Sequence, residues 1–211
     1  IGNYAFYGCS ALETLEFKTG GTSPLAIDPE AFYNTTNLTT LRLPARLAEM
    51  NLQIFDGFTK LKSVVAYGVT KIGNNAFDQC YSLSSVTFES GSQDLHIGFQ
   101  DEDSDKGAFY DSPLTYIYLD RELIYDNNDL DTWDEGIFAN SYYNDDDYLN
   151  QGLSVTLGDQ VKTLSDYMFN WLPIKQLTIP GTVTTIGNDV FNECSKLTSI
   201  TFERGSQDLH I

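Results

Sequence analysis

The two histidines are the residues best suited to acid–base or metal chemistry, because a neutral imidazole accepts a proton or binds a metal near neutral pH. His96 and His210 occupy the same position of an identical heptad, GSQDLHI, at residues 91–97 and 205–211. A catalytic or metal-binding histidine is expected to interrupt a repeat, whereas these two follow it. No triad pattern accompanies them, and the phosphate-loop, H-E-x-x-H and C-x-x-C motifs are absent. We therefore expect a protein that is not an enzyme and needs no cofactor.

Clusters of acidic residues are the other chemical candidates, since calcium takes roughly six to eight oxygen ligands. The spacing of the richest cluster departs from the D-x-[DN]-x-[DN]-G loop of a calcium site. A solvated loop is the favoured interpretation and calcium binding the alternative, so no metal site is predicted. The residues of the calcium alternative are Asp126, Asp129, Asp131 and Asp134, and further acidic clusters lie at 101–105 and 145–147.

All of these residues belong to a repeating sequence. Residues 72–97 and 186–211 match at most positions and share the pattern I-G-x-x-A-F-x-x-C-x-x-L-x-x-(I/V/L)-x-F. A constant motif at variable spacing is typical of a solenoid, whose coils tolerate inserted loops. The motif phenylalanine recurs every 22 to 32 residues, at Phe6, Phe32, Phe55, Phe77, Phe109, Phe138, Phe169 and Phe191.

The repeats predict a single solenoid domain over residues 1–211, with long inserted loops within 98–152. Ile1 and Ile211 both occupy the first position of the unit, and neither end reads as a polar capping repeat. We therefore expect the chain to be an excerpt of a longer one. The uncapped ends also predict end-to-end self-association.

Apolar residues alternate in the last part of each unit, as at Ile117 and Leu119, which predicts a short strand. A second extended piece precedes the Ile-Gly pair, as in VTKIG, and Pro44 and Pro180 are expected to end strands. The segment between the two strands is too short for a free helix, so a single helical or 3-10 turn is expected. Stacking buries residues that one unit cannot bury alone, which predicts a right-handed solenoid of short parallel β-strands with about eight repeats.

The three cysteines, Cys9, Cys80 and Cys194, fall on one position of the pattern. If coils stack at about 4.8 Å, the nearest pair lies about 14 Å apart, beyond the ~7 Å between Cα atoms that a disulfide allows. We therefore expect three free, buried thiols that act as small apolar side chains.

The pattern IGxxAFxxCxxLxxIxF, with IP after the strand in LTIPGTVTTIG, resembles the leucine-rich repeats of the BspA-like bacterial surface proteins. The resemblance covers essentially the whole chain, with full units beginning at Ile1, Ile72 and Ile186. It implies a leucine-rich-repeat-type coil and extracellular or cell-surface display. It also implies binding of host matrix or plasma proteins, or of other cells.

Most outward positions of the predicted strands are serine or threonine. The exceptions are Tyr116 and Tyr118, joined by Val65 and Tyr67 two coils earlier. Exposed tyrosines are candidate anchors for a ligand, because the ring gives a large contact area and the hydroxyl orients the partner. The alternative is that the tyrosine-rich insertions fold over these residues and cover them. These four residues are the predicted ligand-binding set.

The net charge of −18 disfavours binding to nucleic acid and to anionic membranes. No apolar run approaches the ~20 residues of a membrane-spanning helix. Two functions stay open. The first is a non-enzymatic adhesion or ligand-binding domain of a bacterial surface protein, which binds host protein or glycan through the sheet face and the long loops. The second is a structural spacer without a ligand, which the near-identical units favour, and a calcium-stabilised scaffold is a third interpretation.

Overall fold

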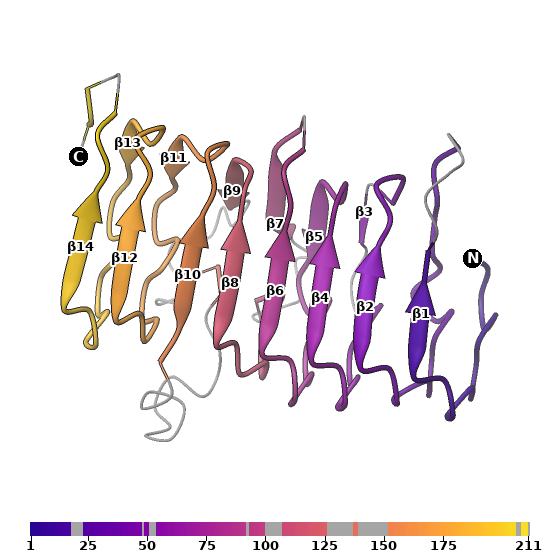
Figure 1. Ribbon diagram of the computed structural model, residues 1–211. Helices are drawn as coiled ribbons and strands as arrows, with labels where there is room; N and C mark the ends of the chain where they lie inside the picture. Colours follow the sequence, from indigo (N-terminus) through magenta and orange to yellow (C-terminus); the bar gives the residue numbers. More distant parts are fainter. Residues whose placement is uncertain are drawn as a thin grey trace.

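The computed structural model is a stack of coils in which strands from successive repeats lie side by side (Figure 1). The described residues are 1–17, 23–47, 49–50, 54–91, 93–99, 107–125, 137–138, 152–205 and 208–210. Below, each coil is named by its motif phenylalanine.

The front of the stack is a row of parallel strands, one from each coil along the row (Figure 1). Six of them form one sheet in the order β1-β2-β4-β6-β8-β10, and β12 pairs with β14 beyond it. The predicted strands at the end of each unit are therefore confirmed. Their bounds are β1 Thr14–Glu16, β2 Thr40–Leu43, β4 Ser63–Ala66, β6 Ser85–Phe88, β8 Tyr116–Leu119, β10 Ser154–Leu157, β12 Gln176–Ile179 and β14 Ser199–Phe202.

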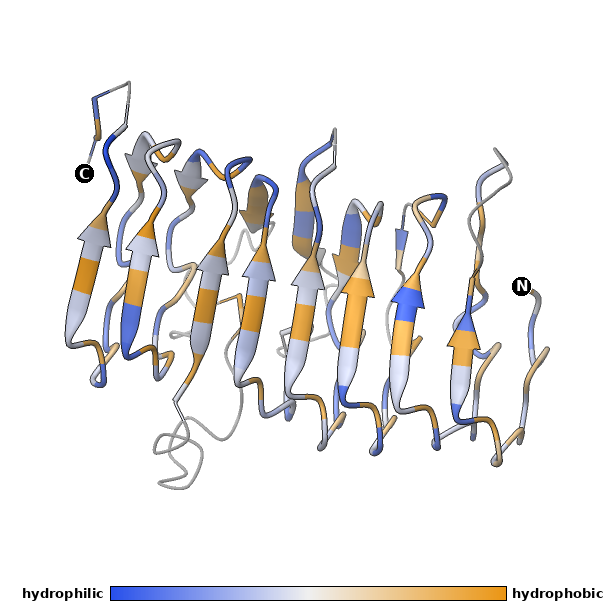
Figure 2. Cartoon of the chain, in the orientation of Figure 1, coloured by the Kyte–Doolittle hydropathy of each residue, from blue (hydrophilic) through white to orange (hydrophobic). Residues whose placement is uncertain are grey.

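The front strands pair in register, so equivalent residues of successive coils form rows across the sheet. Val86 lies between Val64 and Ile117, and Ile117 pairs with Val155. These residues point inward and are buried, and Figure 2 shows the row as an apolar band across the middle of the strands. The flanking positions point outward, which confirms the predicted alternation. β-branched side chains suit such a pleated surface that is buried on one side.

Shorter strands form a second layer behind the front sheet (Figure 1). The second extended piece that was predicted in each unit is confirmed by β5, β7, β11 and β13. The strands β3 and β9 hold the same place in units that lack the Ile-Gly pair. The back strands pair in parallel as β3-β5-β7-β9 and as β11-β13. Their bounds are β3 Glu49–Met50, β5 Lys71–Gly73, β7 Leu95–Phe99, β9 Leu123–Tyr125, β11 Thr163–Leu164 and β13 Thr185–Ile186.

Where the structure describes the segment around a motif phenylalanine, that segment is a series of turns, and no helix occurs in the described residues. The predicted helical or 3-10 turn is therefore wrong. In the Phe77 coil the N–H of Asp78 donates to Asn75 O at 3.1 Å, within the segment. The N–H of Phe77 donates instead to Ala108 O of the next coil, at 2.9 Å. A helix keeps its N–H groups within the segment, whereas here alternate N–H groups join one coil to the next.

This alternation depends on residues with positive φ two positions before and two after the phenylalanine. Asn75 has a φ of 58° and Gln79 a φ of 55°. A residue in the left-handed region reverses the local chain direction, so successive N–H groups point alternately along the segment and toward the next coil. The same two positions have positive φ in three other coils, at Tyr4, Gly8, Tyr167, Trp171, Asp189 and Glu193.

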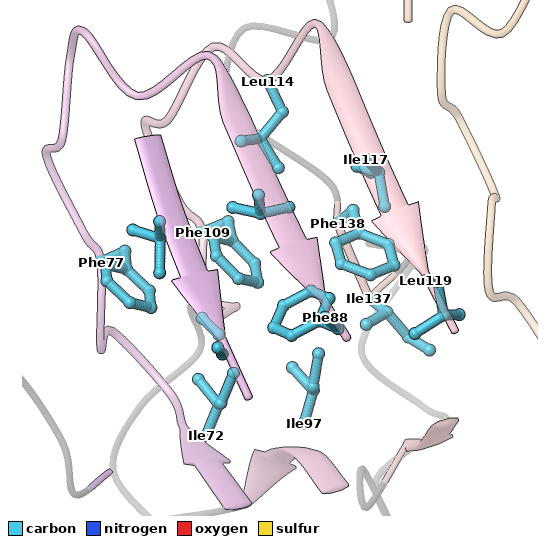
Figure 3. Close-up of a cluster of buried hydrophobic side chains, with 14 of the residues drawn as sticks. Ile72, Phe77, Phe88, Ile97, Phe109, Leu114, Ile117, Leu119, Ile137 and Phe138 are labelled. Carbon is cyan, nitrogen blue, oxygen red and sulfur yellow. The ribbon is translucent and has the colours of Figure 1, made fainter. Parts of the chain in front are cut away.

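The motif phenylalanines form a column through the core, as the repeat pattern predicts. Figure 3 shows Phe77, Phe109 and Phe138 in a row beneath the front strands, with Ile72 and Ile97 beside them. The Phe77 and Phe109 rings stack at 5.3 Å between centroids, and Phe109 lies 5.8 Å from Phe138. Burial of each fully buried ring contributes about 1.5–3 kcal/mol. Ring pairs add about 0.5–1.5 kcal/mol, so the column is a main source of stability.

The cysteine position of the pattern holds small side chains that donate to the preceding coil. Cys80 Sγ donates to Phe55 O at 3.1 Å and Cys194 Sγ donates to Phe169 O at 3.0 Å. Ser112 occupies the same position in its coil and donates to Phe77 O at 2.8 Å. The prediction of free, buried thiols is correct for Cys80 and Cys194, but Cys9 is free and exposed. Cys9 belongs to the coil of β1, which lies at the edge of the six-stranded sheet.

The row of front strands is interrupted between β10 and β12, which are linked by one isolated bridge, Leu153 to Ile174. In several other coils the residue after the strand donates its N–H to the preceding coil, as Gly158 does to Leu119 O at 2.8 Å. Pro180 occupies this position after β12 and has no N–H. The proline therefore ends the strand, as predicted, and also removes one hydrogen bond across the break.

Candidate ligand-binding face

The outward side of the front sheet is the surface on which the predicted ligand-binding residues lie. Tyr116 and Tyr118 both belong to β8 and point away from the core, because Ile117 between them is buried. Tyr116 is 38% exposed, and Tyr118 is half-buried. Burial raises the pKa of the Tyr118 hydroxyl, and the nearby Asp120 carboxylate raises it further. Tyr118 is therefore protonated at neutral pH and can act as a hydrogen-bond donor.

Val65 lies in the same outward row as Tyr118, with Thr87 between them. Val65 therefore lies two strands from the tyrosine pair, as the repeat predicts, and Val65, Tyr116 and Tyr118 lie on one face. Val65 is half-buried. The outward row is continuous across β4, β6 and β8, so these side chains belong to a single surface patch.

Tyr67 lies just beyond the end of β4 and contacts Arg42 of the neighbouring coil. The Arg42 guanidinium carbon is 5.4 Å from the centre of the Tyr67 ring, and Arg42 Nη2 donates to the Tyr67 hydroxyl oxygen. This cation–π contact holds the ring against the sheet. Tyr67 thus lies at the edge of the patch, held in place by Arg42, and its hydroxyl oxygen already accepts a hydrogen bond.

A groove of about 1050 Å³ lies over β10, β12 and β14, beside the two tyrosines. Ser154 pairs with Tyr116 and Thr156 with Tyr118, so the first wall of the groove is the strand next to β8. The outward residues of the groove are Ser154, Thr156, Gln176, Thr178, Ser199 and Thr201, with Lys175 and Lys196 at one end and Asp159 and Glu203 at the other.

Sequence reasoning predicted the outward serines and threonines but missed the groove and its two lysines. One signal for the lysines was available in the sequence. In two consecutive units a lysine, Lys175 or Lys196, lies next to the last core residue before the front strand. The hollow itself depends on how the β12–β14 pair sits against β10, which a repeat pattern does not contain.

A buried arginine near the candidate face was also missed. Arg121 is 2% exposed and follows β8 by two residues. Its guanidinium donates to Glu89 O at 2.9 Å, to Val69 O at 2.7 Å and to Tyr67 O at 2.5 Å. Burial lowers the pKa of Arg121, although the group remains a cation at neutral pH. The side chain ties the β8 coil to the two coils before it and so supports the edge at Tyr67.

The described residues that could take part in catalysis or metal binding are not brought together. His96 lies on β7 next to Lys71 and Ile124, while His210 pairs with Thr185 at the far end of the stack. Among the described residues, no group of histidine, cysteine and carboxylate side chains could hold a metal ion. The residues of the calcium alternative, Asp126, Asp129, Asp131 and Asp134, lie outside the described residues, as do the acidic clusters at 101–105 and 145–147.

No helix in the described part of the chain has the length and apolar character needed to cross a membrane.

The fold and this face define a parallel β-solenoid built from leucine-rich repeats. A family model of the BspA-type leucine-rich repeat region matches residues 1–99 and 102–210, with six copies. The chain therefore belongs to the BspA-type leucine-rich repeat family, which confirms the resemblance drawn from its motif.

Two solved structures are similar to the chain. A leucine-rich cell surface protein from Faecalibacterium prausnitzii A2-165 is 16% identical with a TM-score of 0.31, over 96% of this chain and 69% of that protein. A leucine-rich repeat protein from Bacteroides ovatus ATCC 8483 is 14% identical with a TM-score of 0.28, over 100% of this chain and 64% of that protein. None of the curated proteins matches the chain in sequence.

Proposed function

We propose that this chain is a non-enzymatic adhesion or ligand-binding domain displayed on a bacterial cell surface. Its partner is a host extracellular protein or a glycan, bound through the outward face of the front sheet and the long loops within 98–152. The observation that carries this function is the pair Tyr116 and Tyr118, two large aromatic side chains on an outward strand face beside a groove. Surface display is what the family resemblance implies.

Physical reasoning supports a binding role for this pair. The core is already formed by the inward residues, such as Ile117 and Leu119, so the tyrosines are not needed to bury the strand. Tyrosine combines a large apolar ring with a polar end and loses little rotamer freedom on binding, which is why it is enriched where proteins bind their partners. An edge fixed by Arg42 and Tyr67 on one side and a groove on the other gives the face a defined shape.

The test is to measure binding of the chain to an array of extracellular matrix proteins, plasma proteins and glycans. We expect binding that is lost in a Tyr116→Ser, Tyr118→Ser double variant with an unchanged Tm. The matched control is Tyr33→Ser with Tyr81→Ser, which removes two exposed tyrosines that lie on the turns, away from the front sheet. Loss of binding in the control alone, or equal loss in both, would contradict the assignment to the sheet face.

A structural spacer is the second candidate, favoured by the near identity of residues 72–97 and 186–211. Units repeated with so little change suit a protein in which length matters more than the residues displayed. Absence of binding to every member of the array would favour the spacer over the adhesion domain.

A further inference from the structure

The groove over β10, β12 and β14 presents an array of hydroxyl groups. Thr156, Thr178 and Thr201 occupy the same outward position of their strands, and all three are exposed. Thr178 pairs directly with Thr201, so two of the three hydroxyls lie on adjacent strands in register. Within the described part of the chain, none of the three has a hydrogen-bond partner. Each hydroxyl can therefore donate one hydrogen bond and accept others from a ligand.

The groove lacks an apolar pocket into which a peptide side chain could be inserted. Leu153, Val155 and Leu177 belong to its lining but are at most 9% exposed, because they point into the core. Protein partners are usually held by aromatic or aliphatic anchors in desolvated pockets. A floor of hydroxyl and amide groups suits a ligand that is itself rich in hydroxyls, which is a saccharide.

Charge is distributed unevenly along the groove. Lys175 directly precedes β12 and Lys196 lies shortly before β14, so both lysines line the end where these strands begin. Asp159 and Glu203 line the opposite end, beyond β10 and β14. With a rise of about 3.3 Å per residue, a strand of four residues separates the two ends by about 13 Å. An anionic group would be attracted to the lysine end, and hydroxyl donors could be bound at the carboxylate end.

The whole chain limits how much negative charge the ligand can carry. A net charge of −18 repels polyanions such as sulfated polymers, whereas a single carboxylate can interact with the local lysine pair. Tyr116 lies on the strand beside Ser154 and offers an aromatic ring at the border of the groove. The apolar face of a sugar ring can pack against such a ring, as other partly apolar surfaces do.

We propose that this groove binds an oligosaccharide ending in a carboxylated sugar, with the carboxylate near Lys175 and Lys196 and the sugar hydroxyls on the threonine row. The inference rests on the proposed function and narrows its ligand to one chemical class. The binding surface extends from the Tyr116 and Tyr118 patch across β10 to β14.

The experiment measures binding of pairs of oligosaccharides that differ only in a terminal carboxylated sugar, such as sialyllactose against lactose. The expected result is tighter binding of the carboxylated member, by about five- to tenfold, which is typical of a pair of exposed ion pairs. Lys175→Gln with Lys196→Gln should abolish this preference, so that sialyllactose binds no more tightly than lactose.

A second pair of variants tests the hydroxyl row. Thr156→Val with Thr178→Val preserves side-chain shape and strand propensity but removes two hydroxyls. We expect binding of both saccharides to fall roughly 25-fold, from about fivefold for each of the two neutral hydrogen bonds. The matched control is Thr14→Val with Thr40→Val, two exposed threonines on the outward side of β1 and β2, which pair with each other at the far end of the sheet. The control should bind as the unmodified chain does.

Equal binding of the two saccharides by the unmodified chain, or full binding by the Thr156→Val, Thr178→Val variant, would overturn the proposal. If no saccharide binds while a protein partner binds and is lost in the Tyr116→Ser, Tyr118→Ser variant, the saccharide inference is wrong and the proposed function stands. If nothing on the array binds, both are wrong.

Discussion

Substitution of Arg121 by methionine tests whether one buried cation stabilises three coils. The guanidinium donates to three carbonyl groups, of which the contact with Val69 O is buried and those with Tyr67 O and Glu89 O are partly buried. Hydrogen bonds to charged groups contribute about 1.5–3 kcal/mol each, or about 4.5–9 kcal/mol for three. Several kcal/mol of this is offset by removing the guanidinium from water. Because methionine fills much of the same space, we expect the free energy of unfolding to fall by about 3 kcal/mol.

The assay is urea denaturation followed by circular dichroism, with a thermal scan beside it. For a domain of this size, about 3 kcal/mol corresponds to a fall in Tm of about 6–12 °C. Arg204→Met is the matched control, because Arg204 also lies two residues beyond a front strand but is exposed. It should change stability by less than about 0.5 kcal/mol. A loss below about 1 kcal/mol in Arg121→Met would refute the reasoning, since the carbonyls would then be satisfied without the guanidinium.

Two further predictions concern the thiols. Cys9 should react with a soluble thiol reagent in the native protein at the rate of an exposed cysteine, while Cys80 and Cys194 should react only after unfolding. Mass spectrometry identifies the labelled cysteines, and labelling of Cys80 or Cys194 in the native protein would contradict their burial. Burial raises the pKa of Cys194 from 9.0 to about 11 and raises that of Cys80 as well. Because these pKa values are raised on folding, the stability that the thiols contribute is present below pH 9 and is lost as the pH rises through the folded value. Urea denaturation at pH 8 and pH 10.5 gives the free energy of unfolding that is lost on raising the pH. This loss should be smaller in Cys194→Ser than in the unmodified chain, and in Cys9→Ser it should equal that of the unmodified chain. Equal losses in all three proteins would exclude the effect.

The repeat pattern predicted those features that depend on one unit and its immediate neighbours. Phe77 and Phe109 stack because equivalent residues of adjacent coils must face each other, and Tyr116 and Tyr118 point outward because strand residues alternate. Pro180 was predicted to end a strand because its missing N–H is a property of the residue itself. The prediction of a helical turn failed because it considered hydrogen bonds within a segment, whereas the N–H of Phe77 donates to the next coil.

The remaining features depend on residues that are distant in sequence. Arg121 donates to Val69 and Tyr67, which precede it by 52 and 54 residues, so no local pattern identifies its partners. The groove with Lys175 and Lys196 requires the position of the β12–β14 pair relative to β10, which the sequence motif does not encode. Cys9 has the same motif position as Cys80, but its exposure depends on whether another coil covers it.

The turns opposite the front sheet set the curvature of the solenoid. Adjacent strands lie about 4.8 Å apart, whereas packed helices require about 8–10 Å, so a solenoid with strands in front and helices behind must bend. Here the rear turns are themselves hydrogen-bonded from coil to coil, as between Phe77 and Ala108 at 2.9 Å, and front and rear therefore advance by similar steps. Figure 1 accordingly shows the front strands as a nearly straight row. A nearly straight solenoid presents a long, uncurved sheet face in which the groove over β10, β12 and β14 is a local hollow, and this geometry suits extended ligands.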